Sequence, residues 1–368
     1  MTIAFRNEID VTVVVADGVA AAVEILPRAR PPLTRLFAGK PAASLPAVLP
    51  RLFSLCATAH QVSFLAAVEA ARDELVDPEI KRQRIAAIIG ERFAELLRGL
   101  FVGHFALDGA SASVVREIMR MSTVLGGNAS GSGCSRREAA SRIGAALATL
   151  GISSTEESPA PGSALARHIA SLDESALSPN PTEQSFLSAA DDRNVVERLM
   201  ADDQAFSDTP DLQGRIPETG VWARHSLRQQ GVPPDAGPAE RLKARVAEVA
   251  RLGAWLAAGE ADNTTEENIL ESYRLGSGLD LGRGAAAVEC ARGRLYHAVE
   301  LDRRGEIVRF EFLAPTEWNF HPRGPLVRAL QGARLSGGRR AEDAVRALVG
   351  SFDPCVGFNL GFRELAHA

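Results

Sequence analysis

Two cysteine segments near opposite ends of the chain constrain the fold more than any other feature. They are Arg51-Leu52-Phe53-Ser54-Leu55-Cys56-Ala57-Thr58-Ala59-His60 and Ser351-Phe352-Asp353-Pro354-Cys355-Val356-Gly357-Phe358. Each has the spacing of a Cys-x-x-Cys metal clamp in which one thiol is replaced by Phe. If the two ends meet, Cys56 and Cys355 offer one thiolate each to a soft metal, with Phe53 and Phe358 closing the rest of a four-thiolate site. We therefore expect neighbouring chain ends and a loosely held metal.

Composition narrows the class of protein. The chain has 368 residues, of which 46% are apolar and 24% charged, so it can bury a large core, and we predict one domain over 1–368. A net charge of -5 and the lack of a Lys/Arg stripe argue against a nucleic acid partner. No apolar run is long enough for a membrane span. Four scattered cysteines and no recognisable leader at Met1–Asp10 indicate the cytoplasm, where thiols stay reduced.

Local patterns predict an α+β protein that is mainly helical, with small antiparallel hairpins. Alternation over 9–15 and 19–26, around Asp17-Gly18, predicts an opening hairpin, and 296–301 with 306–313 predicts a second. Helical spacing is found at 62–75, 85–105, 136–150, 240–259 and 341–350. Flexible loops are expected near 126–135, 151–165 and 202–220.

Taken singly, the cysteine motifs are modest. A Cys four residues before a His is more often a buried thiol beside a packed His than a ligand pair. His60 would lie on the same helix face as Cys56, as a ligand or as a hydrogen-bond partner of one. Cys290 reads as a packed thiol in preference to a third ligand, and Cys134 has no expected role. Either Arg51 or Arg292 would favour a thiolate if the fold brings it close.

Several motifs together resemble the nickel-iron hydrogenase large subunit. The first segment is similar to R-x-C-G-x-C-x-x-x-H, and the second to D-P-C-x-x-C-x-x-H. Between them, Gly282-Arg283-Gly284 and Glu289-Cys290-Ala291-Arg292-Gly293-Arg294-Leu295-Tyr296-His297 resemble the E-A-P-R-G-x-L-x-H stretch, and Pro315-Thr316-Glu317-Trp318-Asn319 resembles P-T-x-W-N. The resemblance covers both ends of the chain well and the middle hardly at all. It implies a large-subunit-like helical bundle.

The departures from that pattern narrow the resemblance. A catalytic large subunit has four cysteine ligands, of which this chain keeps only Cys56 and Cys355, and Thr34 stands where such subunits carry a proton-relaying Glu. Two thiolates cannot complete the nickel-iron site. The chain instead looks like the HupK/HoxV group of hydrogenase maturation proteins, which are large-subunit paralogues. Glu218-Thr219-Gly220-Val221-Trp222-Ala223-Arg224 is similar to an E-T-G-x-x-A-R stretch of that group.

The resemblance implies a non-catalytic scaffold that holds iron, with cyanide and carbon monoxide ligands, between Cys56 and Cys355 before its transfer to the large subunit; no nickel is expected. Arg292 would donate to a cyanide nitrogen, and Arg51, Phe53, His60, Asp353 and Phe358 would surround the pocket. Implied partners are maturation proteins, including a small HypC-type chaperone, and the large subunit itself. Two alternatives stay open: a divergent hydrogenase-like redox enzyme or sensor, and a metal-free structural subunit.

Overall fold

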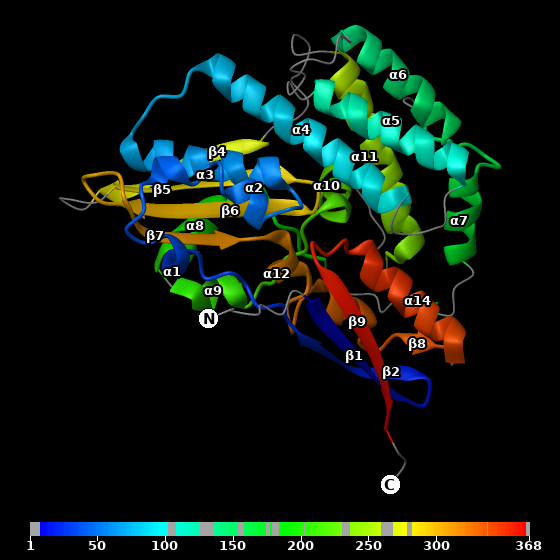
Figure 1. Ribbon diagram of the computed structural model, residues 1–368. Coiled ribbons are helices and arrows are strands. Elements are labelled where there is room, and N and C mark those ends of the chain that lie inside the picture. The colour runs from blue at the N-terminus through cyan, green and yellow to red at the C-terminus, as the bar shows by residue number, and fades with distance from the viewer. Residues whose placement is uncertain are drawn as a thin grey trace.

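The computed structural model describes residues 8–101, 108–125, 135–153, 158–173, 177–178, 184–201, 203–229, 236–258, 268–277, 282–336 and 338–365. These residues form two β-sheets and a group of packed helices, which confirms the predicted α+β class (Figure 1). In these ranges, no helix combines the length and the apolar character that a membrane span requires.

The four-stranded sheet is antiparallel throughout, in the order β4-β5-β6-β7. Its strands are β4 Leu270–Ser277, β5 Gly282–Cys290, β6 Gly293–Leu301 and β7 Ile307–Leu313. Its last two strands are the hairpin that alternation predicted. Every residue of β6 is buried, because α3 (Ala57–Arg72) covers one face of the sheet and α8 (Asp192–Ala201) packs against the other (Figure 1).

Helix α3 lies unusually close to β5. A Cβ atom added at Gly282 would come within 2.3 Å of the Ala71 carbonyl oxygen, and one at Gly284 within 2.2 Å of the Ala67 carbonyl oxygen. Only glycine leaves room for this approach. Because the start of β5 meets the end of α3, the two elements run antiparallel, and the beginning of α3 lies at the end of β5.

The five-stranded sheet joins the two ends of the chain, in the order β3-β8-β2-β1-β9. Its strands are β1 Glu8–Ala16, β2 Val19–Leu26, β3 Leu177–Ser178, β8 Arg334–Leu335 and β9 Gly357–Glu364. The β1–β2 hairpin is the predicted one, and its strands are antiparallel. Beside it, β9 adds a strand from the other end of the chain. The pairing of β9 with β1 is parallel, from Glu8 opposite Gly357 to Val15 opposite Glu364.

Long helices form the second layer of the molecule (Figure 1). Those that pack together are α4 Pro78–Phe101, α5 Gly109–Leu125, α6 Arg136–Thr149, α7 Ala164–Asp173 and α11 Pro238–Ala258. The predicted apolar stripe of α4 lies in the core, with Phe93 and Leu96 fully buried. The remaining helices are α1 Leu33–Phe37, α2 Leu49–Leu52, α9 Asp203–Asp208, α10 Val221–Arg228, α12 Pro315–Asn319, α13 Pro325–Leu330, α14 Gly338–Ser351 and the 3-10 helices Ala42–Ser44 and Ala189–Asp191.

The three expected loops have different outcomes. Residues 126–134 of the first, 154–157 of the second and 202 of the third lie outside the described residues. Within the third, the structure instead places helix α9. Phe206, Leu212 and Ile216 are buried in a core cluster with Trp318, so the polar composition of 203–220 conceals a packed segment.

Candidate metal centre

Cys56 is held in a strained position at the beginning of α3. Its backbone is left-handed, with φ 55° and ψ 37°, which costs a non-glycine residue about 1–3 kcal/mol. The following turn is fixed from α4, because the Glu91 carboxylate accepts the amides of Thr58 at 2.7 Å and Ala59 at 2.9 Å. Burial raises the pKa of Glu91, although both amides oppose that shift. The strained backbone therefore presents a buried thiol from a rigid support.

Arg292 connects the two cysteine segments. Its Nη1 lies 3.3 Å from Cys56 Sγ and 3.0 Å from a Glu95 carboxylate oxygen, while its Nε lies 3.7 Å from Asp353 Oδ2. Burial lowers the pKa of Arg292, but Asp353 and the Cys56 thiolate, with Glu95 and Cys355, outweigh it and raise the pKa well above its ordinary value. A guanidinium cation thus lies between the two cysteine segments. Of the two arginines that sequence analysis considered as neighbours of a thiol, Arg292 takes this place.

Two glycines shape the turn that carries Arg292. Gly220 has φ 108°, and a Cβ there would approach the Arg292 carbonyl oxygen to 2.8 Å. Gly293 has φ 131°, and a Cβ there would lie 2.3 Å from Thr219 Oγ1. That same oxygen accepts the Arg294 amide at 3.0 Å. Glycine is therefore required at both positions, because the backbone has a positive φ and because there is no room for a Cβ atom.

Asn319 ties a third motif to the same place. Its Oδ1 accepts the Thr219 amide at 3.0 Å, and its Nδ2 donates to the Thr219 carbonyl at 2.9 Å. The stretches Glu218–Arg224, Glu289–His297 and Pro315–Asn319, which sequence analysis singled out separately, therefore meet around Arg292. Their shared role is to position one turn.

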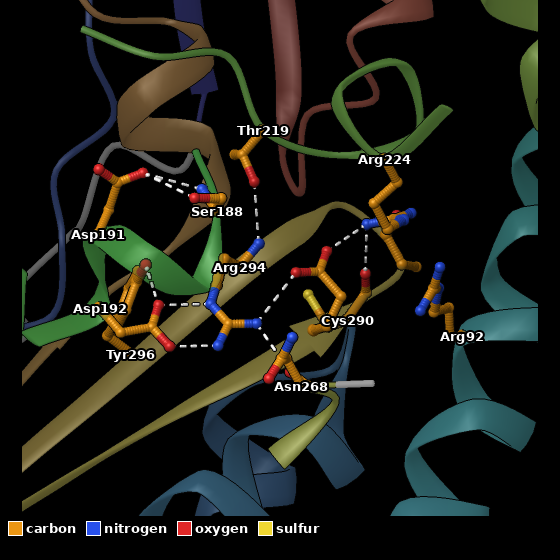
Figure 2. Close-up of polar contacts among 12 residues, drawn as sticks. Arg92, Ser188, Asp191, Asp192, Thr219, Arg224, Asn268, Cys290, Arg294 and Tyr296 are labelled. Carbon is orange, nitrogen blue, oxygen red and sulfur yellow. Dashed lines mark hydrogen bonds and ion pairs between the residues drawn. The ribbon is translucent and has the colours of Figure 1, made fainter. Parts of the chain in front are cut away.

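Buried ion pairs fix the turn from the other side. Arg224 lies beside Cys290 (Figure 2) and donates to the carbonyl oxygens of Cys290 at 3.2 Å and Ala291 at 2.9 Å. It also pairs with Glu248 and Glu289. Glu248 also pairs with Arg92, and all three side chains are buried. Burial alone would raise the pKa of Glu248, but the Arg224 and Arg92 guanidinium groups lower it strongly.

A further buried pair holds the start of β6. Arg294 donates to both carboxylate oxygens of Asp192, which also accept the Tyr296 hydroxyl (Figure 2). The Tyr273 hydroxyl donates to the same carboxylate. Asp192 lies on α8, which packs against the face of the sheet opposite α3. Its carboxylate therefore ties the start of β6, just after Arg292, to α8. The turn is thus anchored on both sides.

Cys355 lies in a more open environment. Thr316 Oγ1 donates to Cys355 Sγ at 3.1 Å and accepts the Cys355 amide at 3.3 Å. Asp353, two residues earlier, has left-handed backbone with φ 51° and an ion pair with Arg245 at 3.9 Å. Cys355 itself is half-buried.

A cavity of about 500 Å³ begins at Thr316, and its lining combines apolar residues with the charged side chains of Arg28, Arg30, Arg35, Asp208 and Glu317. Arg28 lies in its wall, 2.8 Å from Glu317. Burial lowers the pKa of Arg28, but the charges of Cys355 and Glu317 raise it further than burial lowers it. A second cation therefore lies in the wall of this cavity.

Phe53 and His60 form an aromatic wall. Their rings stack in parallel with centroids 3.7 Å apart, and Phe312 packs edge-on against both. His60 Nδ1 lies 2.9 Å from His297 Nε2. Burial lowers the pKa of His60 far below its ordinary value, with His297 and Arg28 adding to the effect, and burial lowers the pKa of His297 to about 3. Both rings are neutral at pH 7.

Two predicted pocket residues lie apart from this group. Arg51 is exposed on α2. Phe358 lies on β9 opposite Ile9 and packs against the core of the five-stranded sheet, so it does not line the cavity at Thr316. Among the described residues, no three His, Cys, Asp or Glu side chains are arranged to hold a metal ion.

Sequence reasoning missed several residues of the centre. They are Arg28, Glu91, Glu95, His297 and Thr316. A signal existed for Glu91 and Glu95, which stand four residues apart beside the apolar stripe of α4. His297 ends one of the resembled motifs. Arg28 had no such signal, because its place depends on the approach of α12.

Comparison with known proteins agrees with this arrangement. The sequence pattern of the family described as nickel-dependent hydrogenase matches residues 243–358. The solved reduced, active form of the Ni-Fe-Se hydrogenase from Desulfomicrobium baculatum is similar, with a TM-score of 0.60, 14% identity, and coverage of 93% of this chain and 95% of that one. The predicted hydrogenase large-subunit-like fold is thereby confirmed.

Curated relatives match along almost the whole chain. The hydrogenase expression/formation protein HupK of Bradyrhizobium diazoefficiens is 58% identical over 100% of both chains. The HupK protein of Rhizobium leguminosarum bv. viciae is 33% identical over 98% of both. The chain therefore belongs to the HupK family of hydrogenase expression/formation proteins.

Proposed function

We propose that this protein is a non-catalytic scaffold in nickel-iron hydrogenase maturation. It transiently holds an iron group with cyanide and carbon monoxide ligands between Cys56 and Cys355, before transfer to the hydrogenase large subunit. The maturation role is supported by the names of the relatives, which are hydrogenase expression/formation proteins. The observation that carries the site is Arg292, which contacts Cys56 Sγ and pairs with Asp353, two residues before Cys355.

A small number of protein ligands suits a cargo that must leave. Iron(II) with strong-field diatomic ligands needs few protein thiolates, and fewer bonds make release easier. The described residues offer thiols but no cluster of three metal-binding side chains. A nickel ion, which would depend on the protein for most of its ligands, finds no such set. We therefore expect iron and no nickel.

Charge supports an anionic cargo. Cyanide and thiolate ligands give the iron group negative charge, which Arg292 and Arg28 would balance, since both guanidinium groups face a cysteine of the site. Arg292 would also donate a hydrogen bond to a cyanide nitrogen. Its Nε makes no hydrogen bond within the described part of the chain, so one donor is left for such a ligand.

The aromatic wall supports a non-catalytic role. Phe53 stands where a catalytic subunit would have a thiol, and its ring is stacked on His60. The position is filled by packed apolar atoms that cannot bind a metal. The cavity at Thr316 is the side from which partners would reach Cys355, namely a small HypC-type chaperone and the large subunit. We place these events in the cytoplasm, where the free thiols stay reduced.

The decisive experiment is infrared spectroscopy of protein purified anaerobically from cells that express the maturation machinery. We expect bands in the cyanide and carbonyl stretching region, with iron present and nickel nearly absent. Cys56→Ala and Cys355→Ala should each lose the bands, whereas Cys134→Ser should keep them. Absence of both bands and iron from the wild type would refute the proposal. Bands that persist in both alanine variants would show that the group is held elsewhere.

A further inference from the structure

Cys290 lies at the place where the fold brings β5 to the beginning of α3. Gly282 meets Ala71 at one end of this contact. The eight residue steps along β5 from Gly282 to Cys290 cover about 26 Å. The fifteen residue steps along α3 from Ala71 back to Cys56 cover about 22 Å, which is a similar length. Ser63, near the middle, donates to the Ala286 carbonyl at 3.3 Å, which confirms the register. The end of β5 and the start of α3 therefore coincide at Cys290 and Cys56.

The register brings the two thiols together in the core. Cys56 and Cys290 belong to the same buried cluster, with 6% and 3% of their surface exposed. Arg292 follows Cys290 by two residues, and its Nη1 lies 3.3 Å from Cys56 Sγ. Cys290 is therefore placed next to a second thiol and a guanidinium group.

The contact belongs to a rigid frame. Arg224 holds the Cys290 carbonyl (Figure 2). The strained left-handed backbone at Cys56 aims the other thiol. A backbone held in such a conformation is typical of functional sites. Neither thiol needs a large rearrangement to meet a common ligand.

The chemistry of binding is simple. A soft cation bound between the two sulfurs would convert two S–H bonds into two S–metal bonds and release two protons.

We propose that Cys290 is a metal-binding thiol that pairs with Cys56 on the same soft metal. Cys290, at the end of β5, thus supplies a thiol in place of the one that is absent from the first cysteine segment at Phe53. Its ligand class is a thiophilic divalent metal, such as iron(II) that brings ligands of its own. This inference rests on the proposed function and adds to it a ligand that the two cysteine motifs do not contain.

The test uses the reduced full-length chain without metal, titrated anaerobically with Co²⁺ alone. Thiolate-to-cobalt charge-transfer absorption follows binding, and X-ray absorption counts the bound sulfurs. Cys290→Ser should weaken Co²⁺ binding by at least about tenfold, since even groups that only orient a ligand contribute about 10–100-fold. It should also remove one sulfur from the count. The matched control is Cys134→Ser, which should equal the wild type.

Each outcome decides the assignment. Equal affinity and equal sulfur count in Cys290→Ser and Cys134→Ser would overturn it, as would a wild type without thiolate-to-cobalt absorption. If Cys290→Ser does not fold, Cys355→Ala serves instead: two bound sulfurs support the pair, and fewer refute it. The infrared experiment separates the two proposals. Bands that survive Cys290→Ser would refute this inference alone, whereas a wild type without bands and iron would refute the proposed function and leave the Co²⁺ result to judge Cys290.

Discussion

The two halves of the candidate centre are built on different principles. Around Cys56, the surroundings are largely buried and fixed: a capped helix start, a second thiol and a turn held by ion pairs. Around Cys355, one threonine hydroxyl makes the direct contact, and a cavity of about 500 Å³ begins beside it. Under the proposed function, the fixed side would keep the cargo and the accessible side would exchange it. The variants below test this division, from the largest expected effect to the smallest.

Glu248→Gln should cause the largest loss, because it leaves Arg92 and Arg224 buried without their carboxylate. Breaking a buried ion pair from one side costs about 3–5 kcal/mol in the free energy of unfolding, measured by urea denaturation. The matched control is Glu197→Gln in an exposed pair with Arg193, with an expected change below about 1 kcal/mol. Similar losses in the two variants would mean that the fixed side does not depend on this network.

Gly220→Ala should strain the Arg292 turn. The added Cβ would meet the Arg292 carbonyl oxygen, and the left-handed backbone adds a cost, so we expect a loss of about 1–3 kcal/mol. Gly214→Ala has the same kind of backbone, φ 90°, but open space around its Cβ. It should lose less stability and leave Cys56 alkylation unchanged, whereas Gly220→Ala should alter that rate. Identical behaviour would argue against a rigid turn.

Acidification should weaken the fixed side through its histidines. Folding lowers the pKa of His297 to about 3, so its contribution to stability is complete above the unfolded value of about 6.5 and declines as pH falls toward 3. At pH 5 the loss amounts to about 2 kcal/mol for this ring. Urea midpoints at pH 7 and pH 5 measure it. His297→Gln should reduce the pH dependence, and an unchanged dependence would exclude this ring as its source.

Thr316→Val should have the smallest effect on folding, about 1–2 kcal/mol, because it removes the two part-buried hydrogen bonds between Thr316 Oγ1 and Cys355. Its chemical effect should be clearer. Without the hydroxyl, the Cys355 sulfur loses its hydrogen-bond partner, and the rate of its alkylation should change severalfold. Thr209→Val, in the same cavity, supplies the control. An unchanged alkylation rate would show that the hydroxyl does not tune Cys355.

Local sequence patterns predicted the individual helices and strands of this fold better than the pairing between them. Alternation and Asp17-Gly18 identified the first hairpin, and helical spacing identified the buried stripe of α4. The strand β9 escaped because its partner β1 lies at the other end of the chain, and no local signal records such a pairing. Helix α9 escaped because its few apolar residues are separated by polar ones.

The candidate centre shows the same difference between residues that local motifs reveal and contacts that depend on how the elements pack. Motif spacing and the family resemblance singled out Cys56, Cys355 and Arg292, and the structure places Arg292 against Cys56. The contact of Cys290 with Cys56 depends on the antiparallel alignment of α3 and β5, which the two glycines permit but which spacing alone does not reveal. Phe358 was misplaced for a related reason: strand β9 begins at Gly357 and turns its side chain onto the core beneath β1.

The parallel pairing of β9 with β1 also gives the centre an order of assembly. The elements that surround Cys56, up to the end of β6 at Leu301, are synthesised well before β9. Cys355 reaches its place only when the last strand has left the ribosome and paired with the first, because the strand begins two residues after it. Pairing over such a distance along the sequence is slow compared with local folding. The Cys355 side of the centre therefore depends on a long-range contact, whereas the surroundings of Cys56 are built from elements closer together in the sequence.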